Sequence, residues 1–162
     1  MKAILAITFV MIFPLLLANP VFGHGFGAET VPVTIGNRNA TLTLSVTPPT
    51  IDSKNNEHEM VVNLSDANSG SVIEHVTYLI ELTKNDKRIF RYMFHDEIGN
   101  LYMKIKTTNS STIQIHGKQG AVLGGWMKQD DFNPLALEGK IFADGGLYKF
   151  HIEIVTVDSD TK

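Results

Sequence analysis

The clearest strand pattern in the chain is VIEHVTYLIELTKNDKRIFRYMFH, residues 72–95. Apolar and polar residues alternate over residues 72–82 and again over 88–95, as in strands that bury one face. The pair Asn85-Asp86, which lies between the two runs, is typical of a short turn. This stretch therefore predicts one long β-hairpin.

The same alternation recurs on both sides of the hairpin. It predicts further strands at residues 40–46, 60–65, 101–105, 112–116 and 148–156. Residues 24–30 and 52–59 lack the pattern, so we expect a flexible start and a polar, charged loop there. Short strands separated by turns at this spacing predict an all-β fold, an antiparallel β-sandwich of two packed sheets.

The predicted core follows from the inward positions of these strands. Bulky apolar residues of the hairpin and of the last strand are expected to pack between the sheets: Tyr78, Ile80, Phe90, Tyr92, Phe94, Phe150, Ile152 and Ile154. The chain contains no cysteine. The domain must therefore be held by its core alone, and thiol chemistry and thiolate metal sites are excluded.

The start of the chain has the order of a secretory signal. Lys2 precedes an apolar run at residues 3–18, and a helix-breaking segment ends in small residues at Gly23. We expect a signal-peptide helix at residues 1–23 and a single domain at residues 24–162. The alternative is an uncleaved anchor, but sixteen apolar residues are fewer than the roughly 20 that span a membrane. The membrane would then be contacted only through this segment.

The charge of the chain indicates which partners it can bind. The chain carries 17 acidic and 14 basic residues, for a formal net charge of −3. Lys and Arg form no cluster in the sequence, which argues against nucleic acid as a partner. We expect instead an unknown protein or surface partner at the cell envelope.

One short motif refines the predicted fold. The run DGGLYKF at residues 144–150 resembles the D-x-[GA]-x-Y motif that precedes a core strand of immunoglobulin-like domains. The resemblance implies a tyrosine corner, in which the Tyr148 hydroxyl bonds a backbone group near Asp144. Phe150 stands where antibody domains have a cysteine, and Trp126 does not occupy the place of their core tryptophan. The resemblance therefore implies the wider immunoglobulin-like class.

A longer resemblance covers most of the chain. The runs HGFG at 24–27, IFRYMFHD at 89–96 and GGLYKFH at 145–151 are similar to a family of secreted proteins in ammonia-oxidising archaea. The resemblance implies a secreted or extracytoplasmic location, including the cell surface, and names no activity. Similar proteins continue beyond the position of Lys162, so we expect this chain to be a truncated form.

Copper binding is one functional hypothesis. Cleavage after Gly23 would make His24 the first residue, whose amine and imidazole could both bind Cu(II). A second histidine would complete the site, and the candidates on outward strand positions are His75, His95, His116 and His151. Solvated surface histidines are the plainer alternative. His58, within Glu57-His58-Glu59, is assigned to the loop at residues 52–59 and is not expected to contribute.

Other motifs give little chemistry. Asp130-Asp131 lacks the spacing of a calcium loop, and the signatures of hydrolases and of nucleotide-binding loops are missing from the sequence. Trp126, in the Gly-rich segment 117–127, could form a binding lip or plug the end of the sandwich, and we favour the plug. The leading hypothesis is therefore an extracytoplasmic binding or structural module without catalytic activity.

Overall fold

The computed structural model describes residues 27–48, 56–120 and 123–157, which form eleven β-strands and no helix. The strands, in chain order, are β1 (Ala28–Ile35), β2 (Arg38–Thr47), β3 (Glu57–Asp66), β4 (Val76–Lys84), β5 (Lys87–Asp96), β6 (Asn100–Thr107), β7 (Gln114–His116), β8 (Lys118–Gln119), β9 (Trp126–Met127), β10 (Leu135–Gly139) and β11 (Tyr148–Thr156). None of the described segments is a helix able to span a membrane. The predicted signal segment and His24 lie outside the described residues.

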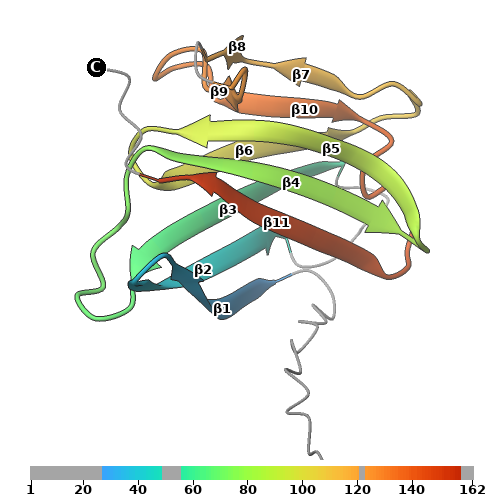
Figure 1. Ribbon diagram of the computed structural model, residues 1–162. Helices are drawn as coiled ribbons and strands as arrows, with labels where there is room; N and C mark the ends of the chain where they lie inside the picture. The colour runs from blue at the N-terminus through green and yellow to red at the C-terminus, as the bar shows by residue number, and fades with distance from the viewer. Residues whose placement is uncertain (1–26, 49–55, 121–122, 158–162) are drawn as a thin grey trace, which may run out of the picture.

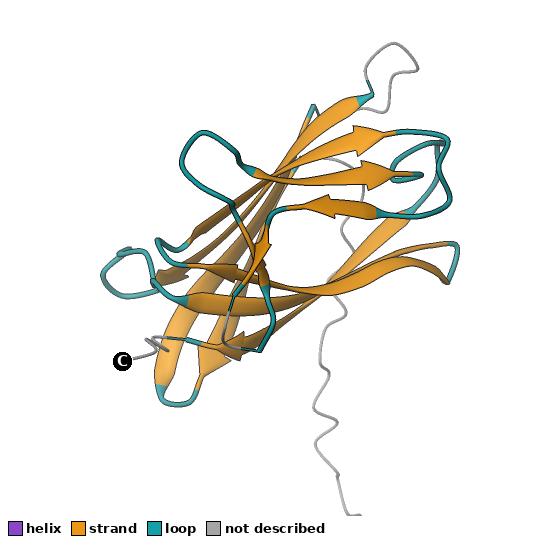
Figure 2. Ribbon diagram, turned by 90° about the horizontal axis from the view of Figure 1, so that it is seen from above, coloured by secondary structure: helices purple, strands orange, loops and turns teal. Residues whose placement is uncertain are grey.

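The strands form two sheets that pack as a β-sandwich, with β4, β5 and β11 in front of β2, β3 and β6 (Figure 1). The orders are β1-β2-β3-β6-β10-β7 and β11-β4-β5-β9-β8. Both sheets consist of strands joined by loops (Figure 2). The prediction of purely antiparallel sheets is wrong at two pairs, since β10 runs parallel to β6 and β9 parallel to β5. In each pair the strands are not consecutive in the chain, and crossovers of this kind allow parallel pairing.

The hairpin predicted at residues 72–95 is β4 and β5, paired from Val76 opposite Asp96 to Lys84 opposite Lys87. Asn85 and Asp86 both have positive φ angles, 49° and 60°. Two left-handed residues in succession are what a two-residue hairpin turn requires, because they match the twist of the flanking strands. The alternation and the turn pair together therefore predicted this element correctly, apart from its first four residues.

The core lies between the two sheets and is centred on β3, β4, β5 and β6. Half of the predicted core residues are buried: Tyr78, Ile80, Phe90 and Phe94. The others pack against the core but are only partly buried: Tyr92, Phe150, Ile152 and Ile154. The last three belong to β11, which matches its predicted bounds but lies at the edge of its sheet. An edge strand has a neighbour on one side only, so its inward residues stay half-exposed.

Four strands were not predicted: β1, β10 and the two-residue strands β8 and β9. β1 begins at Ala28, within the stretch expected to be flexible, and pairs with β2 from Ala28 opposite Ser45 to Ile35 opposite Arg38. Its inward residues are only partly buried, because β1 is also an edge strand. β10 carries two wholly buried leucines but is only five residues long, too short for its alternation to stand out.

His58 contradicts the loop expected at residues 52–59. β3 begins at Glu57, so His58 points inward and is 2% exposed, while Glu57 and Glu59 are exposed. Its ring lies edge-on to Phe142, with 5.2 Å between the ring centroids. Burial lowers the pKa of His58 below the usual 6.5, partly offset by the Pro48 carbonyl. The imidazole is therefore held neutral inside the core, because burial disfavours its charged form.

This burial predicts a dependence of stability on pH. The folded state takes up the His58 proton at a lower pH than the unfolded chain does. The free energy of unfolding should therefore fall as the pH drops below about 6.5, by at most about 1.4 kcal/mol per pH unit. Urea denaturation at pH 7.5, 6.5 and 5.5 measures the slope. His58→Phe should flatten it, and equal slopes for both proteins would show that His58 is not the group responsible.

The tyrosine corner is present. The Tyr148 hydroxyl donates a hydrogen bond to the backbone carbonyl of Asp144 at 2.7 Å. Lys84 reinforces the corner, since its Nζ donates to the same carbonyl at 3.0 Å and lies 5.1 Å from the centre of the Tyr148 ring. The predicted hydrogen bond is confirmed, and it fixes the path of the chain into β11.

A second tyrosine provides a contrast. The hydroxyl of Tyr78 is buried and finds no hydrogen-bond partner among the described residues. Burial, and then the negative charge of Asp96, raise the pKa of Tyr78. The hydroxyl therefore loses its contacts with water and gains none from the protein, which is unfavourable.

The two tyrosines should respond oppositely to the same substitution. Tyr148→Phe removes a formed hydrogen bond and should lower the free energy of unfolding by about 0.5–1.5 kcal/mol. Tyr78→Phe removes an unpaired buried hydroxyl and should raise it by about 1 kcal/mol. Urea denaturation with an unchanged m-value measures both. Destabilisation by Tyr78→Phe would reveal a partner for this hydroxyl, and an unchanged midpoint for Tyr148→Phe would count against the corner.

Candidate functional site

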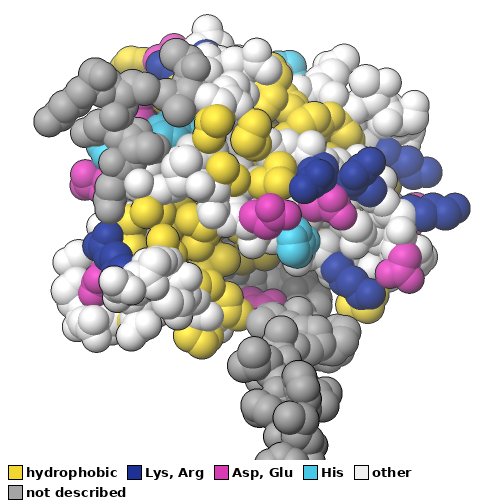
Figure 3. Space-filling view, in the orientation of Figure 1, with side chains coloured by type: hydrophobic (Ala, Val, Ile, Leu, Met, Phe, Trp, Pro, Cys, Tyr) yellow, Lys and Arg dark blue, Asp and Glu magenta, His cyan; other side chains and the backbone are white. Residues whose placement is uncertain are grey.

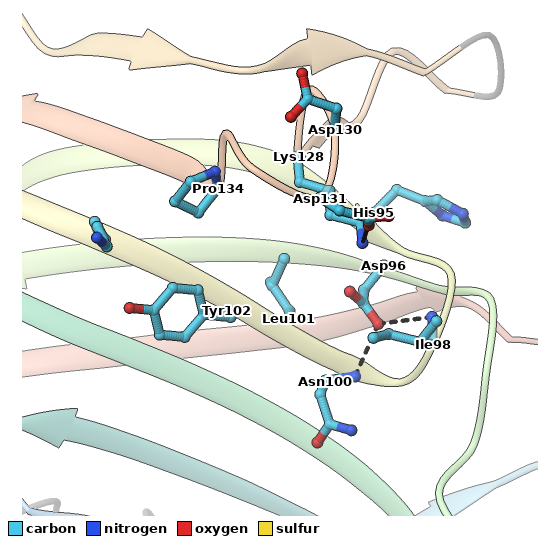
Figure 4. Close-up of a pocket in the computed structure, with 11 residues that line it drawn as sticks. His95, Asp96, Ile98, Asn100, Leu101, Tyr102, Lys128, Asp130, Asp131 and Pro134 are labelled. Carbon is cyan, nitrogen blue, oxygen red and sulfur yellow. Dashed lines mark hydrogen bonds and ion pairs between the residues drawn. The ribbon is translucent and has the colours of Figure 1, made fainter.

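A cleft of about 370 Å³ opens at one end of the sandwich. Three parts of the chain line it: the outer face of β6, the β5–β6 turn, and the loop at residues 128–134 between β9 and β10 (Figure 4). The turn and the loop each carry the chain from the five-stranded sheet to the six-stranded sheet. The cleft therefore lies where two crossings between the sheets come together.

The floor of the cleft is built by β6. Its residues alternate, so that Leu101, Met103 and Ile105 are buried in the core while Tyr102 and Lys104 face outward. The Tyr102 hydroxyl donates a hydrogen bond to Glu59 on β3 at 2.8 Å. Partial burial, followed by this bond, raises the pKa of Tyr102 to about 12. Tyr102 is thus a fixed, neutral aromatic side chain on the floor of the cleft, and Lys104 provides an exposed positive charge beside it.

The β5–β6 turn forms one side of the cleft and is held by its own hydrogen bonds. Asp96 accepts through Oδ2 from the backbone N–H groups of Ile98, at 3.0 Å, and Asn100, at 2.8 Å. Gly99 has a φ of 80° and lies against Ile73, so that a Cβ there would come within 2.4 Å of the Ile73 carbonyl oxygen. Ile98 is 58% exposed at the rim.

The loop at residues 128–134 forms the other side. Asp130 organises it, because its Oδ1 accepts from the backbone N–H groups of Phe132 and Asn133, both at 2.8 Å. The Asn133 side chain donates to both Asp130 oxygens, and the Asn133 carbonyl accepts from Gln129 N–H at 3.2 Å. Hydrogen bonds from the Asn133 side chain, and then from the two backbone N–H groups, lower the pKa of Asp130. The carboxylate is therefore charged and fully engaged within its own loop.

A second pair closes the loop. Lys128 Nζ and Asp131 Oδ1 are 2.6 Å apart, and this contact raises the pKa of Lys128. Both side chains are largely exposed, so the pair contributes little to overall stability. Its effect is local, since it holds the two ends of the turn on either side of Asp130.

Phe132 lies at the tip of this loop and is 93% exposed, the highest exposure among the large apolar residues of the described chain. Phenylalanine is among the residues most often buried, so an exposure this high is uncommon for it. Here its own backbone N–H is bonded to Asp130. Phe132 is therefore presented to solvent from an ordered loop, beside a cleft that carries Lys104 and Lys128.

The structure does not gather the histidines of the copper hypothesis. His75 precedes β4, His116 lies on β7 with Nε2 3.9 Å from Glu138, and His151 lies on β11 beside Glu153 at 3.0 Å. His95 shares the outer face with His151, but its Nδ1 is engaged by Thr77 at 2.9 Å. His95 lies opposite Thr77 of β4, and His151 lies opposite Glu81, four residues further along. This places the two histidines about 13 Å apart along the strand direction.

Within the described ranges, no group of three histidine or acidic side chains could hold a metal ion. His24 lies outside those ranges, so the copper hypothesis stays a prediction. Trp126 lies in β9, which pairs in parallel with β5 so that Trp126 is opposite Phe94. Its side chain is partly buried against the core, which favours the plug over an open binding lip.

The sequence interpretation overlooked the loop at residues 128–134. Asp130-Asp131 was considered only as a calcium ligand pair. An aspartate followed at the third position by Asn133 and then Pro134 is typical of a side-chain-capped turn, and that signal could have identified the loop. The exposure of Phe132 was not foreseeable, because it depends on how the loop sits against β6.

Comparisons with protein-family models, with curated proteins and with solved structures found no match.

Proposed function

We propose that this protein is an extracytoplasmic binding module that recognises a protein partner at the cell envelope through Phe132 and the adjoining cleft. The observation that carries the proposal is Phe132 itself, 93% exposed on a loop whose backbone is tied to Asp130. Because the backbone of this loop is already held, it loses less conformational freedom on binding than a mobile loop would. Aromatic side chains supply a large share of the energy at protein interfaces.

The cleft suggests what the partner presents. Ile98 lines the cleft and Phe132 lies on the adjoining loop, so both offer exposed apolar area, and Lys104 adds a positive charge in the cleft. A matching partner would have an apolar pocket for Phe132 with acidic groups at its border. Asp96, Asp130 and Asp131 also line the cleft, and Lys128 is paired with Asp131, so Lys104 is the cation left to meet an acidic group of the partner.

Export is part of the proposal. It is supported by the signal-like order of residues 1–23, proposed to form a helix, and by the resemblance of the chain to secreted archaeal proteins. The immunoglobulin-like class is also proposed, on the strength of the Tyr148 corner. No geometry among the described residues favours the copper-binding alternative over recognition.

The proposal is tested by variants in a capture experiment. Purified wild-type protein, Phe132→Ala and Leu147→Ala are immobilised and exposed to solubilised cell envelope from the source cells. Leu147 is the matched control, since it is also an exposed apolar loop residue, 43% exposed, and it precedes β11 at the opposite end of the sandwich. Phe132→Ala should weaken retention of a specific partner at least tenfold, because a central aromatic anchor contributes about 2 kcal/mol or more. Leu147→Ala should bind as the wild type does.

A third variant tests the role of the loop. Asp130→Ala keeps Phe132 but removes the acceptor for two backbone N–H groups. It should weaken binding less than Phe132→Ala does, because the side chain remains and only its ordering is lost. Retention of the same proteins by wild type and Phe132→Ala would refute recognition through this residue.

A further inference from the structure

The edges of the two sheets differ in how well they are protected against pairing with another strand. β7 and β8 are three and two residues long. β1 is longer, but Pro32 lies at its centre and Glu29 occupies an inward position, and both features discourage strand addition. β11 has nine residues and no proline, and its inward positions carry no charge. It is the one long edge in the described part of the chain that has neither a proline nor an inward charge.

The inward side of β11 is incompletely buried. Phe150, Ile152 and Ile154 are only partly buried, whereas their partners Leu82, Ile80 and Tyr78 on β4 are wholly buried. In the space-filling view, apolar side chains gather on the face between β11 and the β1–β2 hairpin (Figure 3). A further strand beside β11 would remove this apolar surface from water, which is favourable.

The outward side of β11 has a self-complementary order of charges: Lys149, His151 and Glu153. When a second copy runs antiparallel about a twofold axis at His151, Lys149 of each copy lies opposite Glu153 of the other. Opposite charges directly across two strands stabilise the pairing. The same register sets Phe150 opposite Ile152 and Tyr148 opposite Ile154 on the inward side.

This register also fits the shape of the strand. The pairing of β11 with β4 is regular from Tyr148 to Ile154 and is interrupted by an irregularity between Ile154 and Thr156. Pairing about His151 uses the regular span and stops before the irregularity. A twofold axis at Ile152 would place Lys149 opposite Val155, within the irregular part, and would lose the Lys149–Glu153 pairs.

We propose that two copies of this chain associate through their β11 edges, with Lys149 opposite Glu153, so that their five-stranded sheets become continuous. Each interface residue is then used twice, as a twofold contact requires. Within one copy, Lys149 lies 3.3 Å from Asp86, and Glu153 lies 3.0 Å from His151 and 3.6 Å from Arg91. These pairs are largely exposed and weak, so they do not prevent the side chains from turning to the second copy. The contact is independent of the proposed recognition through Phe132.

A charge-swap experiment tests the proposal. Sedimentation equilibrium of the purified full chain should show a dimer with a dissociation constant in the range of about 10–100 μM. Lys149→Glu places two like-charged pairs across the axis and should raise that constant about tenfold or more. The double variant Lys149→Glu/Glu153→Lys restores opposite charges and should recover the wild-type value. Lys118→Glu, the same change on β8 at the opposite edge of the sheet, is the control and should have no effect.

The outcomes separate the proposal from its competitors. Thermal unfolding midpoints within a few degrees of the wild type confirm that the variants are folded. A wild-type protein that stays monomeric to about 1 mM would overturn the proposal. A dimer unaffected by Lys149→Glu, or one that the double variant fails to restore, would overturn it equally, because the register about His151 would then be incorrect.

Discussion

Replacing Phe142 by alanine is expected to lower the free energy of unfolding by about 3–5 kcal/mol, the range for removing a buried phenylalanine. Phe142 is 1% exposed and contacts three rings from two strands, β3 and β11. Its centroid lies 5.2 Å from those of His58 and Tyr148 and 6.3 Å from that of Phe150. The substitution would open a cavity between β3 and β11 that these rings cannot fill without leaving their strands.

Phe150→Ala is the matched comparison for this prediction. Phe150 carries the same side chain but lies on an edge strand and is only partly buried. Replacing Phe150 by alanine removes less buried area. It should therefore lower the free energy of unfolding by clearly less than Phe142→Ala does. Urea denaturation of both variants measures the difference. A larger loss for Phe150→Ala would mean that β11 is covered more fully than the structure shows.

Gly99→Ala should lower the free energy of unfolding by about 2–4 kcal/mol, combining left-handed strain with overpacking. Gly99 has a φ of 80°, and an added Cβ would lie 2.4 Å from the Ile73 carbonyl oxygen. The turn cannot move away freely, because Asp96 holds it through the N–H groups of Ile98 and Asn100. The variant should therefore also disturb the rim of the cleft.

Gly36→Ala is the control for Gly99→Ala. Gly36 also has a positive φ, 58°, but a Cβ there meets nothing within 4 Å. It should cost only about 1 kcal/mol, the conformational term alone. Comparison of the two denaturation midpoints isolates the packing contribution at Gly99. Equal losses for the two variants would show that the β5–β6 turn is not packed against Ile73 as described.

How far the fold could be predicted depends on whether the deciding information is local. The β4–β5 hairpin and β11 were predicted because alternation and the Asn85-Asp86 turn are local features. β1 was missed because only Val31, Val33 and Ile35 mark its inward face, and Pro32 interrupts the strand pattern. The parallel pairing of β10 with β6 depends on a crossing between the sheets, and no local pattern encodes that.

The same difference between local and distant contacts applies to individual side chains and to the cleft. The bond from Tyr148 to Asp144 joins residues four apart, so a short motif could predict it. The contact of His58 with Phe142 joins residues far apart in the chain, and His58 was assigned to a loop because its charged neighbours hid the strand alternation. The cleft arises where the β5–β6 turn meets residues 128–134, a meeting that only the assembled fold creates.

Site-directed photocrosslinking in the source cells tests the central claim most directly, namely that Phe132 is the contact with the partner. A photoreactive phenylalanine analogue is placed at position 132 in one variant and at position 147 in another, both exposed positions on loops. We expect a discrete crosslinked product from position 132 and none of that size from position 147. The same product from both positions, or none from position 132 when the variant is folded and present in the envelope, would contradict the account.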